Sequence, residues 1–143
     1  MKKKFQYKSE VQSIATIRKD MEDLAESWDI PSSEAKQITL VLEELFSIII
    51  NYAFKDKTNQ DIGFIISQND GIIHLLLSDD GIPFNPLEYN PEQLSDPASS
   101  DDGGMGLSLI RVFADSIEYK REAQKNHLLI QKTIRSQPET EQS

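Results

Sequence analysis

The sequence predicts an α+β fold, a two-layer α/β sandwich in which one sheet lies under about three helices. Two stretches of the chain carry apolar residues in steps of three and four, which is typical of amphipathic helices. Two others each hold a pair of β-branched or aliphatic runs around a short polar turn, which is typical of antiparallel hairpins. Helices that alternate with hairpins favour a mixed, mostly antiparallel sheet. The 143 residues suggest one domain, expected over 1–135, and a polar tail over 136–143.

The first elements are expected to be a strand and a helix. Aromatic residues alternate with polar ones over Lys4–Lys8, which predicts a short strand at an edge of the sheet. Ser9 and Gln12 have the spacing of a capping box, so a helix should follow. Its apolar stripe is expected to pack on the core, although such a stripe also suits a dimer or a partner helix. The stripe consists of Ile14, Ile17, Met21, Leu24 and Trp28.

A second helix is expected from Pro31-Ser32-Ser33-Glu34, with a serine hydroxyl as its cap, to about Phe54. One of its faces is an apolar core stripe. A mostly polar stripe borders it, because residues at these positions fall within roughly 80° of one another on a helix. The core stripe is Ile38, Val41, Leu42, Leu45, Ile49 and Tyr52, and the polar stripe is Glu44, Ser47, Ile48 and Asn51.

The rest of the chain predicts two hairpins around a loop and a third helix. Ile62–Ser67 and Ile72–Leu77 should pair through a turn at Gln68–Gly71, because Asn and Asp followed by Gly favour tight turns. A long loop is expected at about 85–103, and a helix should begin at Met105. The second hairpin should pair Ile117–Arg121 with Leu128–Ile134 around Gln124-Lys125-Asn126.

Composition excludes several classes of protein. There is no apolar run near the roughly 20 residues of a membrane span, and Lys2–Lys4 lead into Phe5-Gln6-Tyr7-Lys8 and not into the apolar stretch of a secretory signal. The chain has no Cys, which excludes disulfides and thiolate metal sites and fits a cytoplasmic location. Its net charge of −9 disfavours direct nucleic-acid binding. Seven acids and no Lys or Arg lie between Asp79 and Asp102, so this stretch alone carries −7.

Three segments carry residue types that suit chemistry. Glu44 lies beside a core stripe, where desolvation favours a general base, and Asn51 on the same polar stripe can bind a ligand; a solvated helix face is the simpler alternative. Asp79 ends a strand, where it can accept a hydrogen bond from an exocyclic amine, while Gly81 allows close approach of a planar ligand; turn chemistry is the alternative. The run Gly103-Gly104-Met105-Gly106-Leu107 opens a helix, where free backbone N–H groups suit a phosphate.

Other motifs are missing or weak. The glycine run lacks the third Gly of a dinucleotide fingerprint and follows a loop, not a strand. The sequence also has no Walker A motif and no His-Arg-Asp loop, so the common nucleotide-binding and eukaryotic-kinase patterns do not apply. His74 and His127 lie in separate predicted strands, where packing or surface roles are expected and no metal pair.

In order and spacing, the three segments resemble the ATP-binding fold shared by gyrase, Hsp90, sensor histidine kinases and MutL. The nearer resemblance is to the anti-sigma factor serine/threonine kinases of this superfamily, over roughly residues 5–134. Three motifs carry it: Leu42-Glu43-Glu44-Leu45 leading to Asn51-Tyr52-Ala53-Phe54, then Asp79-Asp80-Gly81-Ile82-Pro83-Phe84-Asn85-Pro86, then Gly103-Gly104-Met105-Gly106-Leu107-Ser108-Leu109-Ile110. The resemblance implies a Bergerat-type fold and binding of ATP with Mg²⁺, with the loop at 85–103 as a lid.

The resemblance also implies roles for individual residues. Glu44 would be the catalytic base, and Asp79 would accept the adenine amine. The remaining positions would surround the nucleotide: Asn51 on the polar stripe, Tyr52 against the adenine, Gly81 and Pro83 beside the base, Gly103, Gly104, Met105, Gly106 and Leu107 at the lid hinge and phosphates, and Thr133 on the last strand.

One position departs from the family pattern. Four residues after the base the family has an Asn that holds Mg²⁺, and this chain has Ile48, which offers no oxygen. Three interpretations stay open: another group holds the metal, ATP binds without useful turnover, or the position was changed from Asn.

The sequence therefore supports competing hypotheses. The first is an anti-sigma-type serine/threonine kinase that phosphorylates an anti-anti-sigma protein and contacts a sigma factor through a homodimer. The second is a catalytically impaired nucleotide-binding module that sequesters its partner, motivated by Ile48. A third, ranked lower, is the ATPase part of a sensor histidine kinase, since both His residues fall in predicted strands. The acidic stretch suggests that a basic partner surface binds the lid.

Overall fold

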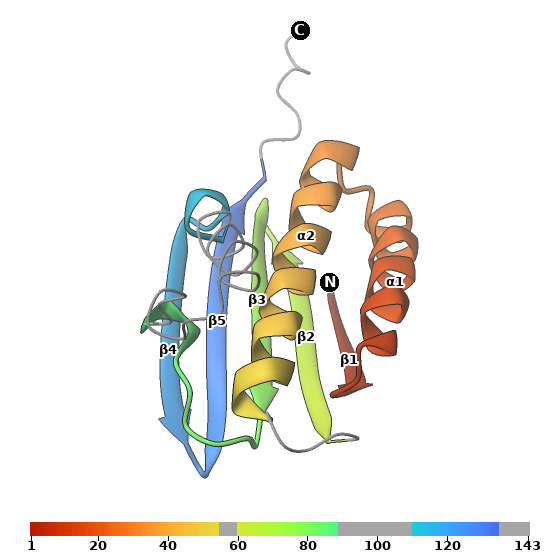
Figure 1. Ribbon diagram of the computed structural model, residues 1–143. Coiled ribbons are helices and arrows are strands. Elements are labelled where there is room, and N and C mark those ends of the chain that lie inside the picture. Colours follow the sequence, from red (N-terminus) through yellow and green to blue (C-terminus); the bar gives the residue numbers. More distant parts are fainter. Residues whose placement is uncertain (55–59, 89–109, 135–143) are drawn as a thin grey trace, which may run out of the picture.

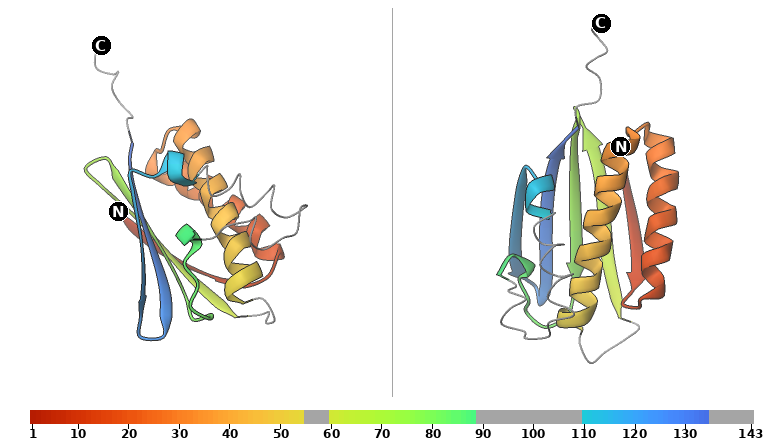
Figure 2. Two further views of the ribbon diagram at one scale, coloured as in Figure 1. Left: turned by 60° about the vertical axis from the view of Figure 1, so that its left-hand side comes forward. Right: turned by 45° about the horizontal axis from the view of Figure 1, so that its top comes forward.

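The computed structural model describes residues 1–54, 60–88 and 110–134, and the account below is limited to them. One five-stranded sheet lies under a layer of helices (Figure 1). Seen from the side, the described helices all cover the same face of the sheet (Figure 2, left). The predicted α+β sandwich is confirmed.

Every neighbouring pair of strands in the sheet is antiparallel, in the order β1-β2-β3-β5-β4. The strands are β1 (Lys2–Lys8), β2 (Asp61–Asn69), β3 (Ile72–Asp79), β4 (Ser116–Glu122) and β5 (Lys125–Thr133). Because β1 and β4 lie at the ends of this order, the expected edge strand at the N-terminus is confirmed. The described strands include no parallel pair, so the sheet is more regular than the mixed one that was expected.

The helical elements follow the predicted stripes. They are α1 (Gln12–Trp28), α2 (Ser32–Ile48), the π-helical turn η1 (Ile49–Ala53), the short 3₁₀ helix η2 (Pro86–Glu88) and a helical stretch at 110–113. The helix expected to reach about Phe54 does so, but its last turn widens: the N–H of Phe54 donates to the carbonyl of Ile49, five residues back, at 3.2 Å. The start of the third predicted helix, from Met105, lies outside the described residues.

Neither helix begins with the predicted side-chain cap. No side chain donates or accepts a capping bond at the start of α1 or α2. Ser9 is fully buried instead, and it exchanges two hydrogen bonds with Gln60: its N–H donates to the Gln60 carbonyl at 2.8 Å, and the Gln60 N–H donates to its hydroxyl at 3.0 Å. A partner 51 residues away thus replaced the local cap that the capping-box spacing predicted.

The two hairpins turn at residues with positive φ. Asp70 and Gly71 have φ of 53° and 78°, as in a type I′ turn, and they lie within the predicted first turn. The second turn is at Ala123 and Gln124, with φ of 55° and 63°. It comes earlier than predicted, because neither residue type signals such a turn. Asn126, predicted to be in the turn, lies instead within β5.

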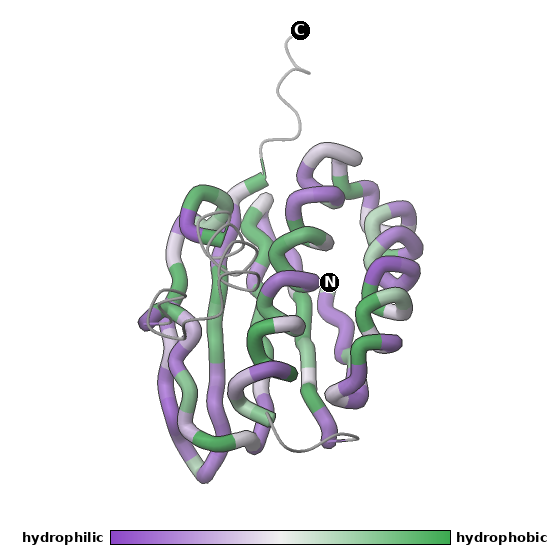
Figure 3. The backbone as a smooth tube through the Cα atoms, viewed as in Figure 1, coloured by the Kyte–Doolittle hydropathy of each residue, from purple (hydrophilic) through white to green (hydrophobic). Residues whose placement is uncertain are grey.

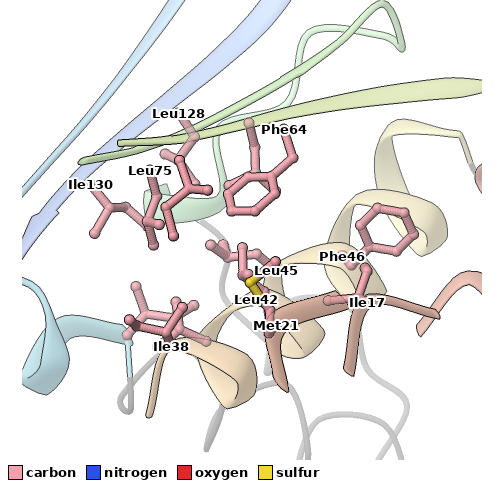
Figure 4. Packing of buried hydrophobic residues seen from close by; sticks show 14 of the residues in the cluster. Ile17, Met21, Ile38, Leu42, Leu45, Phe46, Phe64, Leu75, Leu128 and Ile130 are labelled. Carbon is pink, nitrogen blue, oxygen red and sulfur yellow. The ribbon is translucent and has the colours of Figure 1, made fainter. Parts of the chain in front are cut away.

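The core lies between the helix layer and the sheet (Figure 4). The backbone coloured by hydropathy shows hydrophobic and hydrophilic residues alternating along α1 and α2, and hydrophobic residues in the middle of β5 (Figure 3). Burial of each large side chain contributes about 1.5–3 kcal/mol, so this interface is the main source of stability. Helix residues Ile17, Met21, Ile38, Leu42, Leu45 and Phe46 face sheet residues Phe64, Leu75, Leu128 and Ile130. Within the described ranges, no helix has both the length and the apolarity needed to cross a bilayer.

Candidate functional site

Asp79 is a buried carboxylate at the end of β3. The residue is only 4% exposed. Its Oδ1 accepts hydrogen bonds from the N–H of Gly81 and from Nδ2 of Asn126, both at 2.9 Å. Burial raises the pKa of Asp79 above its usual value, while these two hydrogen bonds and the charge of Arg121 act in the opposite direction. The described residues donate no hydrogen bond to Oδ2 of Asp79. A buried carboxylate with one free oxygen is suited to accept a hydrogen bond from a ligand.

A small hollow lies beside this carboxylate. It has a free volume of about 10 Å³, which is about enough for one water molecule. An aromatic base can therefore enter only if part of the lining moves. The hollow combines an apolar wall with two buried polar groups, and it is lined by Ile49, Leu77, Asp79, Phe84, Pro86, Tyr119, Asn126 and Leu128.

The segment after β3 packs closely against η1. A Cβ on Gly81 would lie 2.6 Å from the carbonyl oxygen of Ala53, and the N–H of Ile82 donates to the same oxygen at 3.2 Å. Arg121 on β4 donates to the carbonyl of Gly81 at 2.8 Å. The close approach that was predicted for Gly81 is present, but in this structure the neighbour is the backbone of Ala53.

The ring of Tyr52 lies beside that of Phe84, which lines the hollow. Their ring centroids are 5.6 Å apart and the ring planes are inclined by 25°, which is a stacked arrangement. Tyr52 belongs to η1, Phe84 to the segment after β3, and both are half-buried. Pro83, expected beside a base, is exposed. An aromatic ring therefore already covers Tyr52, the residue expected to lie against adenine.

The polar stripe predicted on the second helix is divided between two environments. Glu44 and Ser47 are half-buried and Asn51 is exposed on η1, whereas Ile48 is 4% exposed and belongs to the core. Among the described residues, no group of three His, Asp or Glu side chains could hold a metal ion. Ile48, the position at which the resemblance implies a Mg²⁺ ligand, is apolar and offers no oxygen.

The structure does not bring every candidate to one place. Thr133 pairs with Ile72, whereas Asp79 pairs with Asn126, at the other end of β3 and β5. Seven residues of strand separate the two pairs, which is about 23 Å. The N–H of Thr133 donates there to a carboxylate oxygen of Asp115 at 2.6 Å. The phosphate-binding candidates Gly103, Gly104, Met105, Gly106 and Leu107 lie outside the described residues.

Asn126 is the polar residue at this site that sequence reasoning missed. It is 5% exposed and bonds directly to Asp79. It alternates with the buried residues Leu128 and Ile130, so all three point to the helix-covered face. That period of two in the sequence was the available signal, since an Asn in step with core residues requires polar partners.

Comparison with known proteins assigns this chain to a family. A model of the histidine kinase-like ATPase domain matches residues 7–132. The chain belongs to this family. The name of the family supports ATP as the ligand. The superfamily resemblance expected from the sequence is confirmed. The serine/threonine-protein kinase BtrW of Bordetella bronchiseptica is 28% identical over 104 residues, which are 72% of each chain.

Solved structures show the same fold at low sequence identity. A chain of the SiaB–SiaC complex from Pseudomonas aeruginosa matches with a TM-score of 0.63 and 13% identity, over 91% of this chain and 88% of that one. The blue-light activated histidine kinase of Erythrobacter litoralis EL346 matches with a TM-score of 0.56 and 18% identity. That match covers 78% of this chain but 34% of the histidine kinase, so this ATPase domain spans about a third of that protein.

Proposed function

We propose that this chain is an ATP-dependent serine/threonine protein kinase of the anti-sigma type, which phosphorylates an anti-anti-sigma protein. The observation that carries the proposal is the Asp79 carboxylate, buried at an apolar hollow with Oδ2 free of described hydrogen bonds. Membership in an ATPase family and the kinase name of BtrW support it.

The hollow would bind the adenine of ATP. Adenine presents an exocyclic amine that donates a hydrogen bond, and Oδ2 of Asp79 would accept it. Leu77 and Leu128 would contact one part of the ring, and Tyr52 would stack on it once the ring of Phe84 has moved. Gly81 and Pro83 would form the adjoining wall, Asn51 would lie near the nucleotide, and the run 103–107 would bind the phosphates through backbone N–H groups.

Glu44 would act as the general base. It lies on α2 one turn before Ile48 and is half-buried, which favours proton transfer over full hydration. Its carboxylate would take the proton of a partner Ser or Thr hydroxyl while that oxygen attacks the γ-phosphorus. The bond from the γ-phosphorus to the bridging oxygen breaks, and ADP leaves with that electron pair.

The partner of the kinase would be a single-domain anti-anti-sigma protein. The likeness to a chain of the SiaB–SiaC complex shows the fold alone, but it is consistent with a domain that works in a protein complex. A sigma factor would bind a homodimer of this chain in the cytoplasm. The excess of seven acids over 79–102 would attract a basic partner surface, so partner affinity should fall at high salt.

The test is to mix the purified protein with radiolabelled ATP and candidate anti-anti-sigma domains. The expected result is label on a partner Ser or Thr, weaker nucleotide binding by Asp79→Asn, and binding without transfer by Glu44→Gln. The absence of both nucleotide binding and partner phosphorylation in the unaltered protein would sink the proposal.

Burial of Ile48 favours a second candidate, a nucleotide-binding module that sequesters its partner with little turnover. Ile48 is a core residue, so the usual Mg²⁺ ligand is replaced by a side chain with a packing role. This candidate predicts ATP binding and partner binding without label transfer.

A further inference from the structure

Asn126 makes five side-chain hydrogen bonds in the network around Asp79. Its Nδ2 donates to Oδ1 of Asp79 and to the carbonyl of Ile82, both at 2.9 Å. Its Oδ1 accepts from the hydroxyl of Tyr119 at 2.6 Å and, at 3.2 Å each, from the N–H of Phe84 and the guanidinium of Arg121. The single side chain connects β3, β4 and the segment that follows β3.

These partners fix the orientation of the amide. Three donors surround Oδ1 and two acceptors surround Nδ2, so a flipped amide would set donors against donors. Because both Nδ2 protons are used, Asn126 has no donor left for a ligand. Asn126 can therefore affect nucleotide binding only through the groups to which it is hydrogen-bonded, Asp79 above all.

We infer that Asn126 is a positioning residue for base selection, which holds Oδ1 of Asp79 so that Oδ2 faces the hollow and accepts the amine of adenine. The inference rests on the proposed function, since it assumes that the hollow binds a nucleotide. Guanine carries a carbonyl oxygen where adenine carries its amine, so a fixed, ionised carboxylate favours ATP over GTP. A carboxylate that rotates or carries a proton loses this preference, because a protonated oxygen can donate to the guanine carbonyl.

The charge around Asp79 supports the same role. Burial is the main influence that raises the pKa of Asp79, and the hydrogen bond from Asn126 is the largest of the influences that lower this pKa. Asp80 on the same strand end adds repulsion, and Arg121 on β4 adds attraction. Among the described residues of the other packed elements, the titratable Tyr119 on β4 lines the same hollow, and Tyr52 on η1 stacks on Phe84, which also lines it. Without the Asn126 amide, Asp79 would stay protonated to a higher pH.

The test is calorimetric titration of the full chain with ATP and with GTP between pH 5 and pH 9. Asn126→Ala should bind ATP at least tenfold more weakly, while its affinity for GTP changes less than threefold. The pH below which its affinity for ATP declines should also be higher than in the unaltered protein. In an Asp79→Asn background, Asn126→Ala should cost no further ATP affinity. Gln131→Ala, on an exposed position of the same strand, is the control.

The inference fails alone if the unaltered protein prefers ATP and Asn126→Ala weakens ATP and GTP by the same factor. Failure of the unaltered protein to bind either nucleotide would instead remove the proposed function. Carboxyl-carbon NMR gives a readout that needs no nucleotide: the pKa of Asp79 should be higher in Asn126→Ala, and an unchanged value overturns the inference. If Asn126→Ala does not fold, Asn126→Ser, which keeps one donor and one acceptor, enters the same measurements under the same criteria.

Discussion

The rings of Tyr52 and Phe84 are stacked, with their centroids 5.6 Å apart and their planes inclined by 25°. Phe84 also lines the hollow beside Asp79, where only about 10 Å³ is free. The ring of Phe84 thus covers one face of Tyr52, and in the proposed complex adenine would take its place. Nucleotide binding would require this contact to break, and the binding-competent form would be a fraction of the free protein.

Phe84→Ala should therefore strengthen ATP binding. Apparent affinity is reduced by the fraction of molecules that are competent, so if one molecule in ten is open, removal of the ring gains up to about tenfold. Stopped-flow and calorimetric titrations measure the gain. Phe5→Ala, which removes a half-buried ring from the edge strand β1, is the matched control and should leave ATP affinity unchanged. Weaker binding by Phe84→Ala would show that the ring supports the site.

Gly81→Ala should destabilise the protein and weaken ATP binding. A Cβ at this position would lie 2.6 Å from the carbonyl oxygen of Ala53 and 2.9 Å from its Cβ, so the backbone must shift. Overpacking of this kind typically costs about 1–3 kcal/mol of unfolding free energy. Urea denaturation measures it. Gly63→Ala is the control, because its added Cβ would meet only the carbonyl of Ser78, at 3.8 Å. Equal stability of the two variants would contradict the close contact.

Ile48→Asn tests whether residue 48 can hold Mg²⁺, as the family resemblance implies. An amide placed in this core position costs about 1–3 kcal/mol of stability if it finds no partner. If the amide turns to the nucleotide, ATP binding and turnover should become Mg²⁺-dependent. Ile48→Val, which keeps an apolar side chain, controls for the packing change. Equal Mg²⁺ dependence in the unaltered protein and in Ile48→Asn would indicate that other residues hold the metal.

Asp79→Asn should separate stability from binding. Because the pKa of Asp79 is raised in the folded state, ionisation costs folding free energy. The contribution of Asp79 to stability falls as pH rises from about the ordinary Asp pKa of 3.8 through the folded pKa, and then stays constant. An Asn does not titrate, so the variant should gain stability relative to the unaltered protein across that window. It should also lose ATP affinity by about 10- to 100-fold, the loss of a hydrogen bond to a charged group.

Urea unfolding between pH 3.5 and pH 7, together with ATP titration, measures both effects. Asp70→Asn, at the exposed hairpin turn, makes the same chemical change away from the core and serves as the control. A variant that loses stability with rising pH in parallel with the unaltered protein would exclude Asp79 as the source.

Most of the fold was predictable because the spacing of apolar residues and the residue types at turns determine it locally. The stripes of α1 and α2 and the Asp70-Gly71 turn needed no knowledge of distant partners. The cap at Ser9 was wrong because Gln60, far along the chain, supplies its hydrogen bonds. The second turn was misplaced because Ala123 and Gln124 adopt positive φ without the residue types that favour it.

The site was predictable only in part. Asp79 and Gly81 were proposed from their motif; Asp79 lines the hollow, and the N–H of Gly81 donates to the Asp79 carboxylate. Thr133 was placed near the nucleotide, but strand register sets it opposite Ile72 instead of near Asp79. Asn126 was overlooked since the misplaced turn removed it from the strand. Register depends on the sum of many pairings, which no single motif reports.

The widened turn η1 has a consequence for how this chain tolerates change in length. A π turn holds one residue more in each hydrogen-bonded ring than an α turn, as the bond from Phe54 to Ile49 shows. Deletion of one codon within 49–53 would restore an ordinary helix and rotate Ala53 by roughly 100° away from Gly81. We expect this segment to accept substitutions more readily than insertions or deletions. In related sequences its length should therefore vary less than the identity of its residues.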